Sequence, residues 1–330
     1  MDKKFFLLND KNNHKIINPK AQEIYFFLKK KCINLYKNIP EIKDFIYKNN
    51  NENTYLYYYP RVKRNNFFFE FINLINSIKL KINIYVFTFD FWIGSNLNYC
   101  HNIWAKKVFK AKTYKVICFS NNLEQLNFYH NFDYTKFKEN IIFNNIWCCY
   151  DKSFCNFNNN PYKKLLLSGC VINNIYPERF ILNNLIGKTN YINKYNYNLN
   201  DVKNNTNNYN LILNKYFACF TSNVYVQKND EFKKFYNTHI LLLKTFEILG
   251  SGSLLVMPKK EENYLKKYGL IHNENCYLID FNKNIIEQIH FIFDNINKYN
   301  IVREKGQKLA KEKLNSVLKI NEIKKLLKIE

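Results

Sequence analysis

A chain of 330 residues is too long for one small core and indicates two domains of about 150 residues each. Hydrophobic residues make up 47% of it, which excludes a wholly disordered protein. The formal net charge of +23 suggests binding to nucleic acid. The lysines are spread along the whole length, however, and Asn, Lys, Ile, Tyr and Phe are the residues that AT-rich codons supply. Compositional bias therefore explains the charge better than a nucleic-acid surface does.

The apolar runs are short. None approaches the roughly 20 residues that a membrane-spanning helix needs, so we expect no membrane span. The start, Met1–Asp10, lacks the long apolar stretch of a secretory signal. Nine cysteines, an odd number without C-x-x-C spacing, indicate reduced and mostly buried thiols in a cytoplasmic compartment.

Strand-like and helix-like segments alternate through the first half. Short apolar runs predict the strands, and apolar residues at helical spacing predict the helices. The expected strands are Ile82–Phe89, Tyr114–Phe119 and Ile141–Tyr150. The expected helices are Ile24–Tyr36, Phe67–Lys79, Asn102–Lys110 and Asn122–His130. This alternation predicts a doubly wound parallel sheet.

A polar turn at Asn156–Pro161 marks the expected domain boundary, and a second alternation follows it. Its strands are predicted at Lys164–Ser168, Tyr216–Thr221, Ser253–Met257 and Cys276–Phe281. Its helices are predicted at Pro177–Ile186, Thr238–Leu249, Glu261–Tyr268 and Lys283–Asn297. The Asn-rich segment Thr189–Tyr209 is predicted to be a surface loop, and Val302–Leu327 one long amphipathic helix. We therefore expect domains at 1–160 and 161–300, followed by a closing helix at 301–330.

The stretch HILLLKTFEILGSGSLLV, which begins at His239, predicts a helix, a turn and a strand. Gly250 and Gly252 suit the helix end and a tight turn. Glu247 has apolar neighbours, and a carboxylate there is costly unless it meets hydrogen-bond donors, such as the two adjacent hydroxyls of a ribose. Lys244 lies one turn earlier on the same helix face.

The start of this helix, near Thr238, would offer backbone N–H groups to a diphosphate. The exposed face of an amphipathic helix would give the same spacing of Lys244 and Glu247, so the spacing alone leaves both interpretations open.

The pattern KTFEILGSGSLLV resembles the donor-site segment of GT-B glycosyltransferases, especially the CgeB-like branch of spore-maturation proteins, in which a helix ending in F-E-x-L-A-x-G leads into an apolar strand. Similar segments follow in the same order: YGLIHNENCY from Tyr268, the helix Ile285–Phe293, and REKGQKLA from Arg303. Upstream, KLLLSG from Lys164 and YPER from Tyr176 resemble the first strand and loop of the same domain. The resemblance covers about residues 163 to 327.

The resemblance implies that Glu247 binds the donor ribose, that Gly169 lets the backbone approach the donor closely, and that Arg179 and Lys244 offset the charge of the diphosphate. Thr221 and Ser222 would line the base pocket.

The implied donor-binding set also includes the turn residues Gly250 and Gly252, and His239. Many retaining members carry a second Glu eight positions before the ribose-binding one. Here that position is His239, which leaves the sugar contact and the anomeric outcome open.

The first half is expected to bind the acceptor. Asp90 follows the Ile82–Phe89 strand, at the edge where open α/β sheets bind ligands, and is our candidate general base. A helix cap explains Asp90 equally well. Trp92 offers an apolar face for stacking on the acceptor sugar, and His101 is an alternative catalytic or sugar-contacting residue.

Taken with the resemblance, the sequence predicts a GT-B architecture of two Rossmann-like domains facing a cleft. The expected reaction transfers a sugar from a nucleotide-diphosphate sugar to the hydroxyl of an unknown acceptor (glycan, protein or lipid). No cofactor is expected. The resemblance implies that no bound metal is needed, and the sequence agrees in lacking the acidic D-x-D cluster of the metal-using fold. The alternatives are a basic nucleic-acid-binding protein and a catalytically inactive glycosyltransferase-like scaffold.

Overall fold

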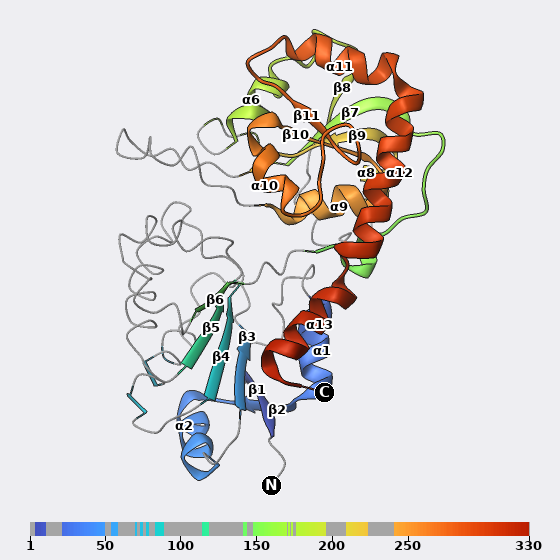
Figure 1. The fold of residues 1–330 in the computed structure, drawn as a ribbon. Coiled ribbons are helices and arrows are strands. Elements are labelled where there is room, and N and C mark those ends of the chain that lie inside the picture. The colour runs from blue at the N-terminus through green and yellow to red at the C-terminus, as the bar shows by residue number, and fades with distance from the viewer. Residues whose placement is uncertain are drawn as a thin grey trace. The chain divides into compact units, whose positions relative to one another are not determined.

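The chain forms two compact units, Met1–Ile146 with Leu327–Glu330, and Trp147–Leu326 (Figure 1). The computed structural model describes residues 4–10, 22–49, 54–58, 70, 73–74, 77–78, 83–88, 114–118, 141–143, 148–169, 171, 173, 176–195, 209–223 and 241–329. Six cysteines whose side chains the structure describes are free thiols, and all of these but Cys155 are buried.

The first unit is built on a parallel sheet. Its strands are β1 (Phe5–Asp10), β2 (Ile33–Lys37), β3 (Thr54–Tyr58), β4 (Asn83–Thr88), β5 (Tyr114–Cys118) and β6 (Ile141–Phe143). They lie in the order β2-β1-β3-β4-β5-β6, and every neighbouring pair is parallel. Helix α1 (Gln22–Lys31) precedes β2 and helix α2 (Ile39–Lys48) precedes β3. The predicted doubly wound sheet is confirmed.

Helix α2 illustrates how local sequence sets an element of this unit. The side chain of Asn38 accepts a hydrogen bond from the Glu41 backbone N–H (3.0 Å), and the Glu41 carboxylate accepts one from the Asn38 N–H (3.0 Å). This capping box fixes the helix start, while Ile42 and Ile46, one turn apart, are fully buried.

Two predictions for the first unit need correction. The helix expected at Ile24–Tyr36 ends at Lys31, because residues 33–37 pair with β1 as strand β2. The strand expected at Ile141–Tyr150 is confirmed only for Ile141–Phe143. The predicted helices Asn102–Lys110 and Asn122–His130 lie outside the described residues, as does most of Phe67–Lys79, of which residues 70, 73, 74 and 77 are helical.

The second unit contains a five-stranded parallel sheet in the order β11-β10-β9-β7-β8. The strands are β7 (Tyr162–Ser168), β8 (Ile192–Tyr195), β9 (Tyr216–Phe220), β10 (Leu254–Pro258) and β11 (Tyr277–Ile279). The helices are α6 (Pro177–Asn183), α8 (Tyr209–Asn214), α9 (Leu243–Ser251), α10 (Glu262–Lys266), α11 (Ile285–Asp294), α12 (Ile296–Lys313) and α13 (Ser316–Leu327), with 3-10 turns η3 (Asp151–Ser153) and η5 (Lys259–Glu261).

Helices cover both faces of this sheet, which explains the unbroken apolar runs of its strands. In β7, Leu166 faces a core that includes residues of α8, α9 and α10. Its neighbours Leu165 and Leu167 face a second core, shared with α6 and α11. Figure 1 accordingly shows α9 and α10 on one side of the strands and α6 and α11 on the other.

Two further predictions need correction. The expected loop Thr189–Tyr209 contains β8, an edge strand in which Ile192 is buried but Asn193 and Lys194 are exposed, so its sequence resembles a polar loop. The helix expected to begin at Thr238 begins at Leu243 instead; Leu241 and Leu242 are not helical, and Thr238 lies outside the described residues.

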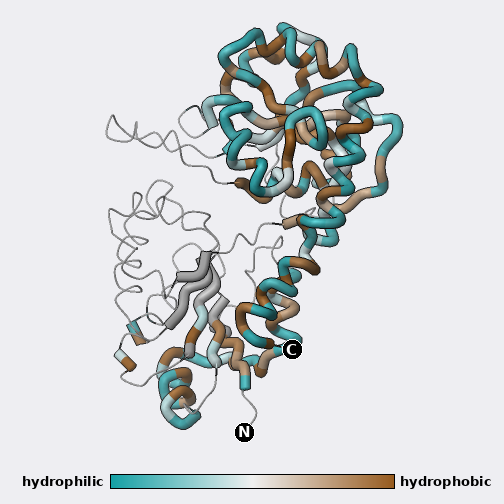
Figure 2. The backbone as a smooth tube through the Cα atoms, viewed as in Figure 1, coloured by the Kyte–Doolittle hydropathy of each residue, from teal (hydrophilic) through white to brown (hydrophobic). Residues whose placement is uncertain are grey.

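The long helix expected at Val302–Leu327 is two helices, α12 and α13. The break lies where Cys149 pairs with the backbone around Asn315. The Cys149 N–H donates to Leu314 O (2.6 Å) and the Ser316 N–H donates to Cys149 O (3.0 Å), so these groups are diverted from a continuous helix. Figure 2 shows hydrophilic and hydrophobic residues alternating along α12, as expected of an amphipathic helix.

These hydrogen bonds of Cys149, and further contacts with α9, connect residues 148–155 to the second unit. The Cys149 thiol lies 3.1 Å from Phe246 O, and the Cys155 N–H donates to Gly250 O (3.2 Å). The division between the units therefore falls at Ile146 and Trp147, before the turn Asn156–Pro161 where the sequence suggested it.

Candidate functional site

The loops that follow β7, β9 and β10 lie at one edge of the second sheet, because the three strands are parallel. Gly169 follows β7, and Thr221 and Ser222 follow β9. Three of the residues that the resemblance implicated thus lie at the edge where doubly wound sheets bind ligands.

Gly169 is closely approached by two cations. Its φ of +97° lies in the left-handed region. A Cβ atom built there would lie 2.5 Å from Lys244 Nζ and 3.1 Å from Arg179 Nη1. Both positive charges are therefore within hydrogen-bonding reach of one point beside Gly169, and only a glycine leaves that point open.

Arg179 is buried, with 2% of its surface exposed. Its Nη2 donates to Thr221 Oγ1 (3.2 Å) and to Ser222 O (3.4 Å), and its guanidinium carbon lies 4.0 Å from the centre of the Tyr176 ring. These contacts hold the guanidinium in a defined orientation next to Gly169.

Lys244 lies in the first turn of α9. Its Nζ donates to Ser168 O (3.0 Å) and lies 5.7 Å from the centre of the Tyr209 ring. The Tyr209 hydroxyl is in turn 2.8 Å from Ser168 Oγ. The N-cap residue of α9 is Leu242, whose side chain accepts no hydrogen bond, so among the described residues the positive end of the helix dipole has no side-chain cap.

Glu247 lies one turn after Lys244 and is 5% exposed. Its helix is otherwise buried and largely apolar. This position excludes the interpretation that Glu247 solvates an exposed helix face. An acid is thus buried next to a cation on the helix that begins at the carboxyl edge of the sheet.

Gly250 and Gly252 lie at the opposite end of α9. A Cβ at Gly250 would lie 2.8 Å from Ser153 O, and Gly252 caps the helix with a φ of +80°. Close packing and helix termination account for both glycines, so we leave them out of the site.

Further charged residues at this edge were not singled out from the sequence. Lys260 forms an ion pair with Glu178, and Asn223 Nδ2 donates to Glu261 Oε2 (2.6 Å). The only sequence signal was that KKEE follows directly after β10, where the carboxyl edge had to lie.

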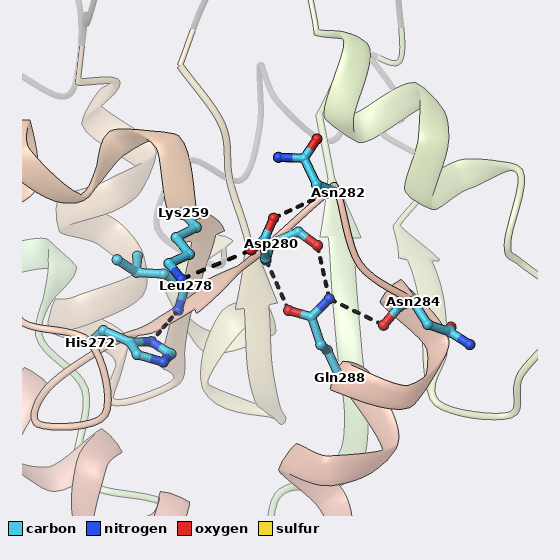
Figure 3. A network of polar contacts seen from close by, with 7 residues as sticks. All are labelled: Lys259, His272, Leu278, Asp280, Asn282, Asn284 and Gln288. Atoms are coloured by element: carbon cyan, nitrogen blue, oxygen red, sulfur yellow. Dashed lines mark hydrogen bonds and ion pairs between the residues drawn. The ribbon is translucent and has the colours of Figure 1, made fainter.

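Beyond β10, the edge is closed by its own hydrogen bonds (Figure 3). The Asp280 N–H donates to Gln288 Oε1 and Gln288 Nε2 donates to Asp280 O, both at 2.9 Å. The Asp280 carboxylate accepts from the Asn282 N–H (3.0 Å) and lies 3.9 Å from Lys259 Nζ. The end of β11 is therefore a structural turn, and the candidate site lies over β7, β9 and β10.

His272 gives this region a predicted pH response. Its Nδ1 accepts a hydrogen bond from the Leu278 N–H (2.9 Å, Figure 3). Burial lowers the pKa of His272, although the charge of Glu262 opposes the shift. The unfolded chain binds a proton near pH 6.5, so this contribution to stability is full above that pH and is lost below it. We expect the melting temperature to fall between pH 7.5 and 5.5, and to fall less in His272→Asn. An unchanged pH slope in that variant would contradict this role.

Asp90, Trp92, His101 and His239 lie outside the described residues. Within the described ranges, no group of three or more His, Cys, Asp or Glu side chains could hold a metal ion. No helix in the described part of the chain is long and apolar enough to cross a membrane.

No protein-family model and no curated protein matches the sequence. Solved structures, in contrast, match over nearly the whole chain. An alpha-glucosyltransferase in complex with UDP and a 13-mer DNA containing a HMU base is 11% identical, with a TM-score of 0.57 over 98% of this chain and 99% of its own. A glycosyltransferase from Rickettsia africae ESF-5 is 11% identical, with a TM-score of 0.54 over 100% of both chains. Anabaena HepE in complex with UDP is 9% identical, with a TM-score of 0.50 over 99% of this chain and 100% of its own.

These likenesses show the fold. The chain has the GT-B architecture of two Rossmann-like domains, as the sequence predicted.

Proposed function

We propose that this chain is a glycosyltransferase of the CgeB-like branch that transfers a sugar from a nucleotide-diphosphate sugar to an acceptor hydroxyl without a bound metal. The observation that carries the proposal is the meeting of Arg179 and Lys244 at Gly169. Two cations and an uncapped helix start at one point favour a ligand with more than one negative charge, such as a diphosphate.

Glu247 supports a nucleotide over a simple diphosphate. A carboxylate one turn from Lys244 accepts hydrogen bonds from both hydroxyls of a ribose that is joined to the diphosphate. Two of the structural neighbours are described in complex with UDP, which makes UDP the first nucleotide to test.

The proposed chemistry uses these groups on the leaving side. The bond between the anomeric carbon of the sugar and the diphosphate oxygen breaks, and the diphosphate gains negative charge as it leaves. Arg179 and Lys244 stabilise that charge because hydrogen bonds hold them in place before the reaction begins. The acceptor oxygen bonds to the anomeric carbon and its proton passes to a base, for which Asp90 stays our candidate.

The ribose contact gives a direct test by calorimetry. We expect the wild-type protein to bind UDP about tenfold more tightly than 2′-deoxy-UDP, because Glu247 loses one hydrogen bond with the deoxy ligand. In Glu247→Gln this preference should nearly vanish, since a neutral amide accepts more weakly. The matched control is Glu274→Gln, at an exposed acid of the same unit, which should keep the wild-type preference.

A protein that binds none of UDP, GDP, ADP and dTDP would refute the proposed function. If one of these nucleotides binds, an assay for its release from the corresponding donor sugar in the presence of a chelator distinguishes a metal-independent enzyme from an inactive scaffold with the same fold.

A further inference from the structure

Six residues at the carboxyl edge of β7, β9 and β10 form a closed polar ring: Glu178, Arg179, Ser222, Asn223, Lys260 and Glu261. They are three pairs of chain neighbours joined by three contacts. Glu178 pairs with Lys260, Asn223 donates to Glu261 (2.6 Å), and Arg179 donates to Ser222 O (3.4 Å). The polar ring thus joins the loops after three strands that are far apart in the sequence.

Five of the six residues of the polar ring are buried, Lys260 being the exposed one, and the ring is not saturated with hydrogen bonds. Ser222, Asn223 and Glu178 are 0%, 0% and 5% exposed. Ser222 Oγ, Asn223 Oδ1 and Glu178 Oε2 nevertheless have no hydrogen-bond partner among the described residues. Buried polar atoms are nearly always paired in native proteins, so three such oxygens in one ring mark a place where a ligand can form hydrogen bonds.

The polar ring lies beside the proposed diphosphate position, because Arg179 belongs to both. Arg179 and Glu178 come from α6, which covers one face of the sheet, whereas Glu247 comes from α9, which covers the other. A nucleotide sugar carries its ribose and its sugar on opposite sides of the diphosphate. With the ribose at Glu247, the polar ring lies on the side of the transferred sugar.

The unpaired oxygens define the chemistry of the ligand. A carboxylate oxygen and an amide oxygen only accept hydrogen bonds, so the ligand must donate them, as sugar hydroxyls do. The two acids and two bases of the polar ring cancel in formal charge. A uronic acid would bring its carboxylate against Glu178 and Glu261 without a spare cation to offset it.

We propose that the polar ring binds the transferred sugar and selects a neutral, hydroxyl-rich sugar over a uronic acid. This inference rests on the proposed function. The two can be tested separately, because UDP alone would contact the polar ring only at Arg179, which the variants below leave unchanged.

The test compares the affinities for UDP, UDP-glucose and UDP-glucuronate by calorimetry. In the wild-type protein we expect UDP-glucose to bind about tenfold more tightly than UDP-glucuronate. Glu178→Gln should reduce this preference severalfold, and Asn223→Ala should weaken only UDP-glucose. Both variants should bind UDP as the wild type does. Glu262→Gln, at an acid that neighbours the polar ring in sequence but pairs with Lys266 (3.1 Å), is the matched control.

Thermal melting of each unliganded variant shows whether it is folded, and Asn223→Ala provides the test if Glu178→Gln is not folded. Unchanged binding of both sugar nucleotides in the folded variants would overturn the inference and leave the proposed function standing. Equal loss of UDP and UDP-glucose affinity would also overturn it, since the polar ring would then act on the diphosphate. Failure of the wild-type protein to bind UDP would overturn both.

Discussion

Replacing Gly169 with alanine is expected to weaken UDP binding roughly 10- to 100-fold while leaving the protein folded. The new Cβ would lie 2.5 Å from Lys244 Nζ, far inside contact distance. Because Nζ is the end of a flexible side chain, it can move away at little cost to the fold. In moving, however, it leaves Ser168 O and the point that it shares with Arg179.

Gly187 provides a closely matched control. Its φ of +86° is similar, so alanine causes the same kind of backbone strain, roughly 1–2 kcal/mol, but nothing lies within 4 Å of the new Cβ. The two variants should therefore lose similar melting temperature, while only Gly169→Ala loses UDP affinity in calorimetry. If both bind UDP as the wild type does, the open point beside Gly169 is not a ligand site.

The sequence predicted four of the five strands of the second sheet and β4, β5 and β6 of the first, because these strands are short runs of apolar residues. It did not predict β1, β2 and β3, which lie within the first 60 residues. Leu165 to Leu167 and Leu254 to Met257 are buried on both faces, as expected of central strands in a parallel sheet that helices cover on both sides. The edge strand β8 was missed because it is not a run of apolar residues. It has neighbours on one side only, so Asn193 and Lys194 remain exposed.

The break between α12 and α13 was missed because its cause is distant in the chain. The helical spacing of apolar residues continues through Leu314. The pairing of the backbone with Cys149 is what interrupts the helix. The start of α9 was misplaced because His239 to Leu243 is an apolar run that suits a helix as well as an extended segment.

The candidate site was only partly predictable. Gly169, Arg179, Lys244 and Glu247 came from a resemblance of ordered motifs, and the structure brings the first three together. The pairing of Glu178 with Lys260 could not be predicted, because nothing in either local sequence indicates the other; sheet topology alone makes them neighbours.

Arg303 holds the end of α9 that lies opposite the candidate site. Of the substitutions considered, its replacement is expected to lower the stability of the second unit most. The side chain is 1% exposed and its guanidinium lies 4.5 Å from the centre of the Phe157 ring. Its Nε donates to Gly252 O (3.0 Å), Nη2 to Asn158 O (3.0 Å) and Nη1 to Asn300 Oδ1 (2.8 Å). One cation thus joins the end of α9, the segment before β7, and α12.

Arg303→Met keeps most of the apolar stem but leaves the buried acceptor Gly252 O and two half-buried acceptors without their donor. Each hydrogen bond to a charged group contributes about 1.5–3 kcal/mol, and loss of a buried charged partner costs about 3–5 kcal/mol in all. For a unit of this size that corresponds to a fall of roughly 10 °C in melting temperature. Lys308→Met, at an exposed residue of the same helix paired with Glu312, is the control and should change little.

Hydrogen exchange read by mass spectrometry gives the more specific result, because a chain of two units need not melt in one step. Peptides from α9, α12 and residues 154–161 should lose protection together in Arg303→Met, since the lost hydrogen bonds join these three segments. Protection in β1 to β3 should be retained. Equal loss of protection across both units would mean that Arg303 supports the whole chain and has no particular role at the end of the helix that carries Lys244 and Glu247.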